Sequence, residues 1–246
     1  MGTLRIAAWS GPRNISTAMM RSWENRTDTC VIDEPLYAHY LKATGLHHPG
    51  RDDVLLHHEN KWESVIEHLI GPCDSPVFYQ KHMAHHLLPN ISRDWLREVE
   101  HIFLIRNPRE MLTSLMKHIP QPRLEDTGLP QQLELFNYLK AKGKIPLILD
   151  SKDILQSPRQ MLSLVCSRLR IKFEESMLSW PAGERDSDGV WAKHWYRSVK
   201  TSTRFAPWGP KKEVVPTHLE GLCLECEEMY TVLFKEKLEK TNATNI

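Results

Sequence analysis

Short apolar runs alternate with stretches of helical periodicity along most of this chain, and that alternation limits the folds it can adopt. Each run is three to six residues long, which suits a buried strand, and helical stretches separate most of the runs. Strands separated by helices form parallel sheets covered on both faces, so we predict an α/β fold with a central parallel sheet flanked by helices. The predicted strands are residues 4–9, 30–32, 77–79, 102–105 and 147–149, and the main predicted helices are 16–23, 62–70, 108–116, 130–140 and 158–169.

The length and charge of the chain restrict its organisation and its partners. At 246 residues with no linker-like stretch, it is expected to form a single domain over residues 1–246. Lys and Arg number 32 against 31 Asp and Glu, a net charge of +1, so no overall field favours nucleic acid or an anionic membrane. Any polyanion must therefore be bound at a local site. A final amphipathic helix is expected at about 216–240, packing on the domain or serving a homodimer.

Two further features bear on location and redox state. The start of the chain has too short an apolar run for a signal peptide, and no stretch is long enough to span a bilayer, which predicts a cytoplasmic protein. Five cysteines are an odd number for such a chain, so a disulfide framework is not expected. Cys223 and Cys226 have CxxC spacing without a second ligand pair, and we interpret them as core residues.

The segment after the first predicted strand has the composition of an anion-binding loop. It runs from Ser10 to Thr17, where a parallel sheet presents free amides and the positive end of a helix dipole. Arg13 adds a positive charge, and the Ser16 and Thr17 hydroxyls can donate to phosphate oxygens. The loop lacks the Gly-x4-Gly-Lys pattern of a Walker A motif.

A second anion site is predicted after the fourth strand. The strand ends at Arg106, Asn107 can cap the following helix, and Pro108 suits the first helical position. Ser114 lies almost two turns beyond Asn107 and so returns to the same face of the helix. Arg106 and Ser114 together could hold a second phosphate, although a simple pairing of Arg106 with a carboxylate is the structural alternative.

The two sites together resemble the sulfotransferases that use 3′-phosphoadenosine 5′-phosphosulfate (PAPS). Their phosphosulfate loop is similar to residues 12–17, and their Arg-x-Pro segment with a later Ser is similar to Arg106, Pro108 and Ser114. A later family stretch resembles residues 149–158. The resemblance implies a P-loop NTPase-like sulfotransferase fold and transfer of a sulfuryl group to a hydroxyl or amine. It also implies these cofactor-binding residues: Arg13, Asn14, Ile15, Ser16, Thr17, Arg106 and Ser114.

This sequence departs from the family pattern in its donor-binding segments. Ile15 replaces the loop glycine, Asn14 the usual Ser, Ala18 the adenine-stacking Trp found in many cytosolic members, and Lys152 a glutamate. A non-catalytic nucleotide-binding protein of the same fold is therefore one alternative. A P-loop kinase is the other, disfavoured by the missing Walker lysine.

Sulfuryl transfer needs a base for the acceptor hydroxyl and positive charge for the leaving phosphate. Glu34 follows the second predicted strand, where carbohydrate-type and tyrosyl-protein members of the resembling family have a glutamate. His82 follows residues 77–81, near the position of the histidine base in cytosolic members. We favour Glu34, keep His82 as the alternative, and assign charge stabilisation to Lys81 and Arg13. No metal is required, and the adjacent histidine pairs lack ligand spacing.

The remaining expectations concern the outer parts of the site. Residues 191–205 mix aromatic and cationic side chains, among them Arg204, and could close over the adenine and 3′-phosphate as a C-terminal loop does in the resembling family; a packed subdomain is the alternative. The acceptor, a small or carbohydrate-like molecule, would meet residues 37–40, 47–58 and 121–128. The sequence does not specify it further.

Overall fold

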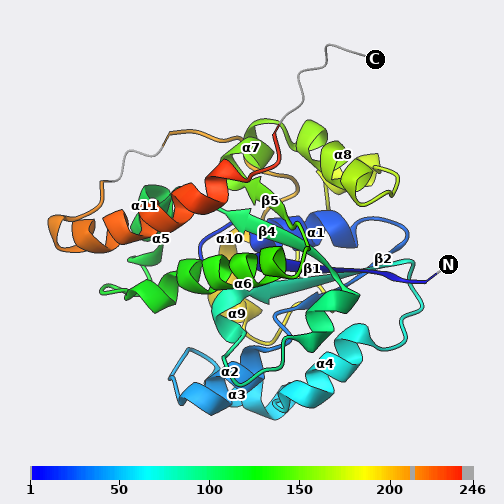
Figure 1. Cartoon of the computed structure of the whole chain (residues 1–246), viewed down its shortest axis with the longest axis horizontal. Helices are drawn as coiled ribbons and strands as arrows, with labels where there is room; N and C mark the ends of the chain where they lie inside the picture. Colours follow the sequence, from blue (N-terminus) through cyan, green and yellow to red (C-terminus); the bar gives the residue numbers. More distant parts are fainter. Residues whose placement is uncertain (1, 211–213, 240–246) are drawn as a thin grey trace.

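A computed structural model describes residues 2–210 and 214–239, and it confirms the parallel α/β architecture (Figure 1). The strands are β1 (Leu4–Ser10), β2 (Thr29–Asp33), β3 (Val77–Met83), β4 (Glu100–Ile105) and β5 (Leu147–Asp150). They form one sheet in the order β2-β3-β1-β4-β5, and every pairing is parallel. All five predicted strands are present, each extended by one or more residues.

The helices begin and end close to the predicted positions. Pro108 and Asn107 act as expected, because Pro108 opens its helix and the Asn107 side chain accepts hydrogen bonds from the Arg109 and Glu110 amides. The α-helices are α1 (Ser16–Glu24), α2 (Tyr37–Thr44), α3 (Arg51–His57), α4 (Trp62–Ile70), α5 (Pro108–Leu115), α6 (Leu129–Ala141), α7 (Ser151–Gln156), α8 (Pro158–Arg168), α9 (Ala192–Trp195), α10 (Arg197–Lys200) and α11 (Glu220–Lys235).

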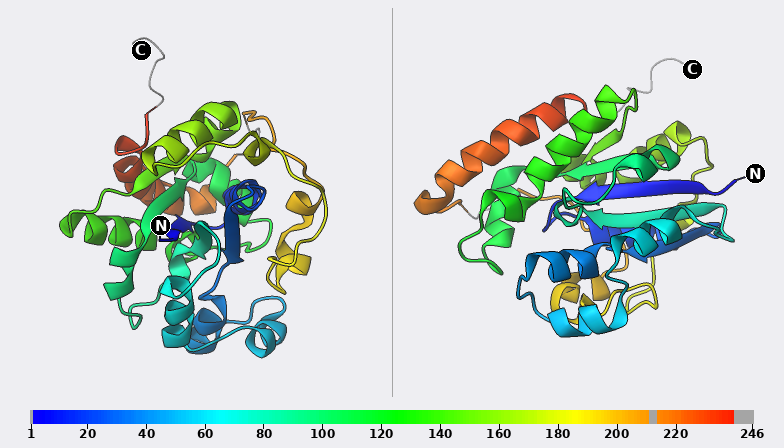
Figure 2. Two further views of the ribbon diagram at one scale, coloured as in Figure 1. Left: turned by 90° about the vertical axis from the view of Figure 1, so that its right-hand side faces the viewer. Right: turned by 60° about the horizontal axis from the view of Figure 1, so that its bottom comes forward.

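Side chains from alternate positions of the strands build a separate core on each face of the sheet. On β1, Ala7 and Trp9 pack with α4, α5, α6 and α11, whereas Ile6 and Ala8 pack with α1 and α8 on the opposite face. Figure 2 shows α6 and α11 side by side over the sheet, with α2, α3 and α4 at the other end of the molecule. Because both faces are covered, the strands have the continuous apolar character from which they were predicted.

The strand order creates the crevice in which a site is expected. β1 lies between β3 and β4. The chain segments that follow these neighbouring strands run in different directions at the carboxyl end of β1, which leaves a crevice there. Two polar side chains occupy this junction: Asn14 donates to the Leu104 carbonyl, and Gln132 of α6 donates to the carbonyls of Trp9 and Leu104. Gly11 approaches the Thr127 carbonyl so closely that a Cβ would lie 2.2 Å from its oxygen. The loop after β1 is therefore tightly held.

The C-terminal helix α11 packs against α5 and α6. Cys223, Cys226 and Leu233 are fully buried, whereas Phe234 is 38% exposed. Small cysteines fill the space against α5 and α6, so the buried face is less evident from the sequence than a face of large apolar residues. Lys240, the predicted end of the helix, lies outside the described residues.

The cysteines carry no disulfide. All five are free thiols, as expected, and the core placement of Cys223 and Cys226 is confirmed. The Sγ atoms of Cys30 and Cys73 lie 3.3 Å apart. Among the described residues, no helix combines the length and apolar character needed to cross a membrane.

Buried histidines predict a loss of stability in mild acid. His82 stacks on Trp9 at 4.3 Å, and His101 accepts from the Trp9 indole while its other nitrogen contacts the Leu96 carbonyl. Burial lowers the pKa of His82 to about 3 and that of His101 to about 4. The unfolded chain therefore binds more protons than the folded one below about pH 6.5, and each such histidine should lower the free energy of unfolding by up to about 1.4 kcal/mol per pH unit.

We expect urea denaturation between pH 7 and pH 5 to show this loss, and His82→Phe to reduce its slope by an amount that approaches one proton near pH 5. His218→Phe, at an exposed position, is the control and should leave the slope unchanged. An identical slope in wild type and His82→Phe would contradict the assignment.

Candidate functional site

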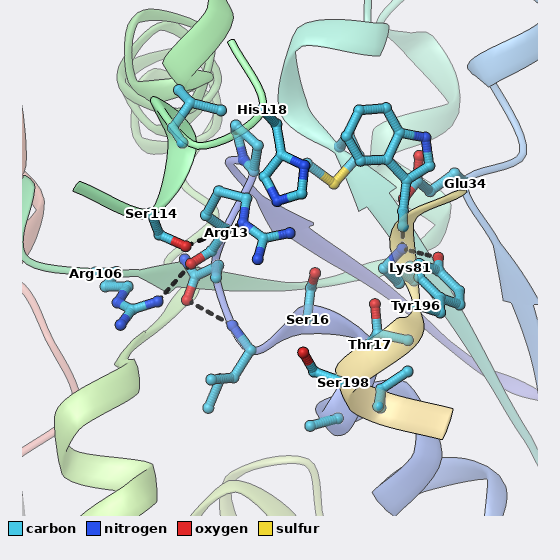
Figure 3. Close-up of a pocket in the computed structure, with 18 of the residues that line it drawn as sticks. Arg13, Ser16, Thr17, Glu34, Lys81, Arg106, Ser114, His118, Tyr196 and Ser198 are labelled. Atoms are coloured by element: carbon cyan, nitrogen blue, oxygen red, sulfur yellow. Dashed lines mark hydrogen bonds and ion pairs between the residues drawn. The ribbon is translucent and has the colours of Figure 1, made fainter. Parts of the chain in front are cut away.

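The carboxyl ends of the strands open onto a cavity of about 370 Å³. This volume lies in the range of small-molecule and cofactor sites, about 300–1,000 Å³. Residues 12–18, which follow β1, line it, together with Glu34 after β2, Lys81 of β3 and Arg106 after β4. Figure 3 shows the labelled side chains around this space, with Arg106 and Ser114 on one side and Glu34, Lys81 and Tyr196 on the other. The site thus draws on four strand ends.

The loop after β1 places a cation in the cavity through an unusual backbone conformation. Arg13 has φ +57°, a region that non-glycine residues seldom adopt. Arg106 holds this conformation, because its Nη1 donates to the Arg13 carbonyl at 2.6 Å. The Arg13 side chain in turn donates from Nε to Ser114 Oγ at 3.1 Å. The two predicted anion sites are therefore in direct contact and form one cationic region.

Arg106 has two partners, the Arg13 carbonyl and the carboxylate of Glu110. The second is the kind of pairing that the sequence allowed as an alternative to phosphate binding. Its Nε and Nη2 donate to Glu110 Oε2 at 3.3 and 3.2 Å, so it does pair with a carboxylate. It still lines the cavity, as does Ser114. Burial and the Arg106 charge lower the pKa of Arg13. Among the residues that the structure describes, Arg13 has no carboxylate partner, so its charge is left for a ligand.

The other loop residues divide between holding the loop and facing the cavity. Asn14 lines the cavity, but its amide is used inside the protein: it donates to the Leu104 carbonyl and accepts from the Ser151 hydroxyl. Ile15 is the N-cap of α1 and provides no side-chain hydrogen bond to the first turn. Ser16 and Thr17 begin the helix beside its free amides, the arrangement that favours an anion.

A buried ionic cluster lies on the other side of the cavity. Lys81 Nζ donates to Asp33 Oδ1 at 2.7 Å, to Glu34 Oε1 at 2.5 Å and to the Tyr196 hydroxyl at 2.7 Å. Tyr196 in turn donates to Asp33. Burial opposes the charge on Lys81, but the Asp33 and Glu34 carboxylates raise its pKa well above the usual value. Sequence reasoning missed Asp33 and the contact with Tyr196, since nothing local links residues so far apart.

Glu34 is the carboxylate of this cluster that faces the cavity. Its φ is +41°, and its amide donates to the Lys81 carbonyl at 2.8 Å, which continues the β2–β3 pairing into the site. Its side chain is 12% exposed, against 1% for that of Asp33. Burial raises the pKa of Glu34, and Lys81 opposes the shift. A carboxylate that is accessible, oriented and raised in pKa is suited to accept a proton.

His82, the alternative base, lies outside the cavity. Neighbouring strand residues point to opposite faces, so when Lys81 faces the site, His82 points into the core against Trp9 and Trp95. Its side chain is 1% exposed. The Lys-His adjacency in the sequence was therefore itself a signal that only one of the two residues could face the ligand.

Imidazole and phenol groups form the wall beyond Glu34. This wall includes at least one residue from each stretch that was expected to meet the acceptor: Tyr37, Tyr40, His48 and Asp126. His85, His86 and His118 also line it and were not anticipated. The sequence could have indicated His85 and His86, because they follow the carboxyl end of β3, where ligands bind in a parallel sheet.

The aromatic segment 191–205 covers the cavity only in part. Trp191 is buried against Tyr37 and His58 and does not line the cavity, so its expected ligand contact is not seen. Trp195, Arg204 and Phe205 do line it, together with Ser198 and Ser202. Lys193 and Lys200 pair with Asp53 and Glu184 at the surface. Part of this segment therefore covers the cavity, as expected of a covering loop, and part packs inside the protein, as expected of a packed subdomain.

No cluster of three or more His, Cys, Asp or Glu side chains suited to a metal ion occurs within residues 2–210 and 214–239.

Comparison with known proteins decides the family. The sulfotransferase domain family matches residues 4–228, which is most of the chain. The chain belongs to the sulfotransferase family. Two Arabidopsis thaliana proteins are similar to this sulfotransferase-family chain: branched-chain-amino-acid aminotransferase-like protein 1 (39% identical over 84% of the chain) and protein 2 (34% over 93%). The match covers only 37% and 41% of their lengths, so the chain spans about two fifths of these relatives.

Solved sulfotransferases share the fold of this family member. The sulfotransferase domain from the curacin biosynthetic pathway aligns over 95% of this chain and 98% of its own, with a TM-score of 0.57 and 15% identity. A sulfotransferase from Alicyclobacillus acidocaldarius aligns over 97% and 98%, with a TM-score of 0.57 and 10% identity. Mouse sulfotransferase SULT7A1, complexed with PAP, aligns over 98% and 87%, with a TM-score of 0.50 and 12% identity. These similarities establish the predicted fold.

The ionic cluster of this sulfotransferase-family chain makes a stability prediction. Lys81→Met leaves the buried Asp33 and Glu34 carboxylates without their cation, and breaking a buried pair costs about 3–5 kcal/mol. Lys193→Met is a matched control, because it breaks the surface pair with Asp53 and should cost less than about 1 kcal/mol. Urea denaturation measures both losses. Equal losses in the two variants would show that the cluster does not stabilise the fold.

Proposed function

We propose that the protein is a PAPS-dependent sulfotransferase that transfers a sulfuryl group to a hydroxyl or amine of a small or carbohydrate-like acceptor. The observation that carries the proposal is the cationic region at the end of β1. Arg13, on the loop that opens α1, is in contact with Arg106, which follows β4, and Arg13 has no carboxylate partner among the described residues. Two neighbouring cations are unfavourable unless an anion joins them, which suits a ligand with phosphate groups.

The residues present fit such a donor. Residues 13–17 are proposed to hold the 5′-phosphosulfate with the free amides of α1, and Arg106 with Ser114 the 3′-phosphate. Arg204, Phe205 and Trp195 line the same cavity and are proposed to contact the nucleoside. For Arg106 to bind phosphate, it must share or release Glu110. The neighbour bound to PAP gives a precedent for a related ligand in this fold.

The proposed chemistry is an in-line displacement at sulfur. Glu34 accepts the proton of the acceptor hydroxyl while the acceptor oxygen forms the new bond to sulfur. The bond between sulfur and the bridging phosphate oxygen breaks at the same time. Arg13 and the loop amides stabilise the negative charge left on the phosphate. Lys81, held by Asp33 and Tyr196, orients Glu34 and limits the rise in its pKa that burial causes. Lys81 is thus proposed to act through Glu34, and His82 has no part because it faces the core.

The alternatives make different demands on the site. A P-loop kinase needs the Walker lysine, and the loop after β1 has none. A non-catalytic nucleotide-binding protein needs the cationic region but has no use for Glu34. The raised pKa and partial exposure of Glu34 favour the enzyme.

Calorimetric titration with adenosine 3′,5′-bisphosphate (PAP) tests the donor site. We expect tight binding without Mg²⁺, and a loss of about tenfold to a hundredfold in Arg106→Ala, since a hydrogen bond to a charged group contributes about 1.5–3 kcal/mol. Arg97→Ala is the control, because Arg97 is exposed and pairs with Glu98. Binding of ATP that requires Mg²⁺, with no binding of PAP, would favour the kinase.

Sulfate transfer from PAPS to a pool of hydroxylated metabolites tests the base. Glu34→Gln should lower kcat by about 10²- to 10⁴-fold and leave the affinity for PAP intact. In the wild type, activity should rise with pH as Glu34 loses its proton, at a pH above the usual carboxylate range because burial raises its pKa. The variant should lack this rise. Failure of transfer with normal PAP binding in wild type would favour the non-catalytic alternative.

A further inference from the structure

Two polar atoms in the wall beyond Glu34, Nδ1 of His85 and Nδ1 of His86, are buried without a hydrogen-bond partner in the described structure. His86 is 2% exposed, and its Nδ1 has no hydrogen-bond partner in the described structure. The ring is fixed by stacking on Tyr37 at 4.6 Å with an interplanar angle of 9°. It lines the cavity, and Nδ1 lies 3.9 Å from Glu34 Oε2. Because buried polar atoms in folded proteins are nearly always hydrogen-bonded, the cavity should hold a partner for this nitrogen.

The charge around His86 indicates what kind of partner this is. Burial and neighbouring histidines lower the pKa of His85 and His86, and burial lowers that of His48 and His118, so these side chains are uncharged at neutral pH. Lys81 is already bonded to Asp33, Glu34 and Tyr196. With Arg13 occupied by the donor, an anionic acceptor would thus meet the Glu34 carboxylate with no free cation among the described residues of this wall. An uncharged group that both donates and accepts hydrogen bonds fits a neutral imidazole.

We propose that this end of the cavity binds an uncharged acceptor with hydroxyls on adjacent carbons, one placed on Glu34 and the other on His86 Nδ1. The inference rests on the proposed function, because Glu34 is taken as the base. Nδ1 and Oε2 are close enough for neighbouring hydroxyls of one acceptor to reach both atoms. His86 is a binding residue here: it orients the diol so that only the hydroxyl on Glu34 loses its proton and receives the sulfuryl group.

A purely apolar acceptor fits less well. Leu115, Ile119 and Met83 offer apolar surface in the cavity, but an apolar acceptor would leave His86 Nδ1 buried and unpaired. A single hydroxyl bridging Glu34 and His86 would still leave Nδ1 of His85, which also lines the cavity, buried and unpaired. This wall therefore selects acceptors that carry a second hydroxyl.

Binding of three rigid alcohols tests the inference independently of turnover. In the presence of PAP, saturation-transfer NMR on the full chain gives the affinities of cis-1,2-cyclohexanediol, trans-1,4-cyclohexanediol and cyclohexanol. We expect the 1,2-diol to bind about tenfold more tightly than the other two, the effect of one added hydrogen bond. His86→Phe keeps the ring and should abolish this preference. His218→Phe, at an exposed position outside the cavity lining, should keep it.

A second variant protects the test against a folding defect. His86→Gln retains a hydrogen-bonding group and should restore part of the 1,2-diol preference, which a defect in packing would not do. Equal affinities of the wild type for all three alcohols, or no binding of any of them, would overturn the inference.

Sulfate transfer from PAPS to the same alcohols separates this inference from the proposed function. A preference for the 1,2-diol in kcat/KM that His86→Phe removes would support both. Equal transfer to cyclohexanol and the 1,2-diol would overturn the diol inference and leave the sulfotransferase standing. Binding of the 1,2-diol that depends on His86, with no transfer to any alcohol while PAP binds, would support the diol site and contradict the enzyme.

Discussion

The contact of Lys81 with Asp33 and Glu34 is the interaction on which the rest of the site depends. It joins the ends of β2 and β3 inside the protein, where neither carboxylate could remain charged alone. Asp33 also accepts from Tyr196 and from the Gly189 amide, so the segment covering the cavity is attached to the same group. Arg21 of α1 pairs with Asp188 next to this point. The orientation of Glu34 and the position of the cover therefore depend on a single buried cation.

The fold could be predicted from the sequence because its signal is local. The apolar runs were short and regularly separated, and Asn107 and Pro108 marked the start of α5 by chemistry that acts within one turn. The buried face of α11 was less predictable, since small cysteines contribute to it as much as large residues. How close a helix packs is decided by the surface it meets, and the sequence of the helix alone does not contain that information.

The site was predictable as far as strand ends define it. Arg13, Glu34, Lys81 and Arg106 all follow or end a predicted strand, and the structure brings them to one cavity. What the sequence did not reveal were the contacts between distant segments, such as Tyr196 with Lys81 or Arg106 with the Arg13 carbonyl. These contacts determine which groups are already paired and which are left for a ligand, and they depend on packing of the whole chain.

Arg13 and Glu34 both adopt a backbone conformation in the left-handed region, and both face the cavity. Such a conformation costs a non-glycine residue about 1–3 kcal/mol, and here contacts with Arg106 and Lys81 hold it. Glycine would adopt either conformation without that cost but would supply neither the guanidinium nor the carboxylate. At position 34 the buried pair with Lys81 outweighs this cost, but at position 13 selection for thermal stability alone would favour glycine over the arginine that the proposed chemistry needs. A library screened only for melting temperature would accumulate glycine at position 13 and lose the cation proposed to hold the donor.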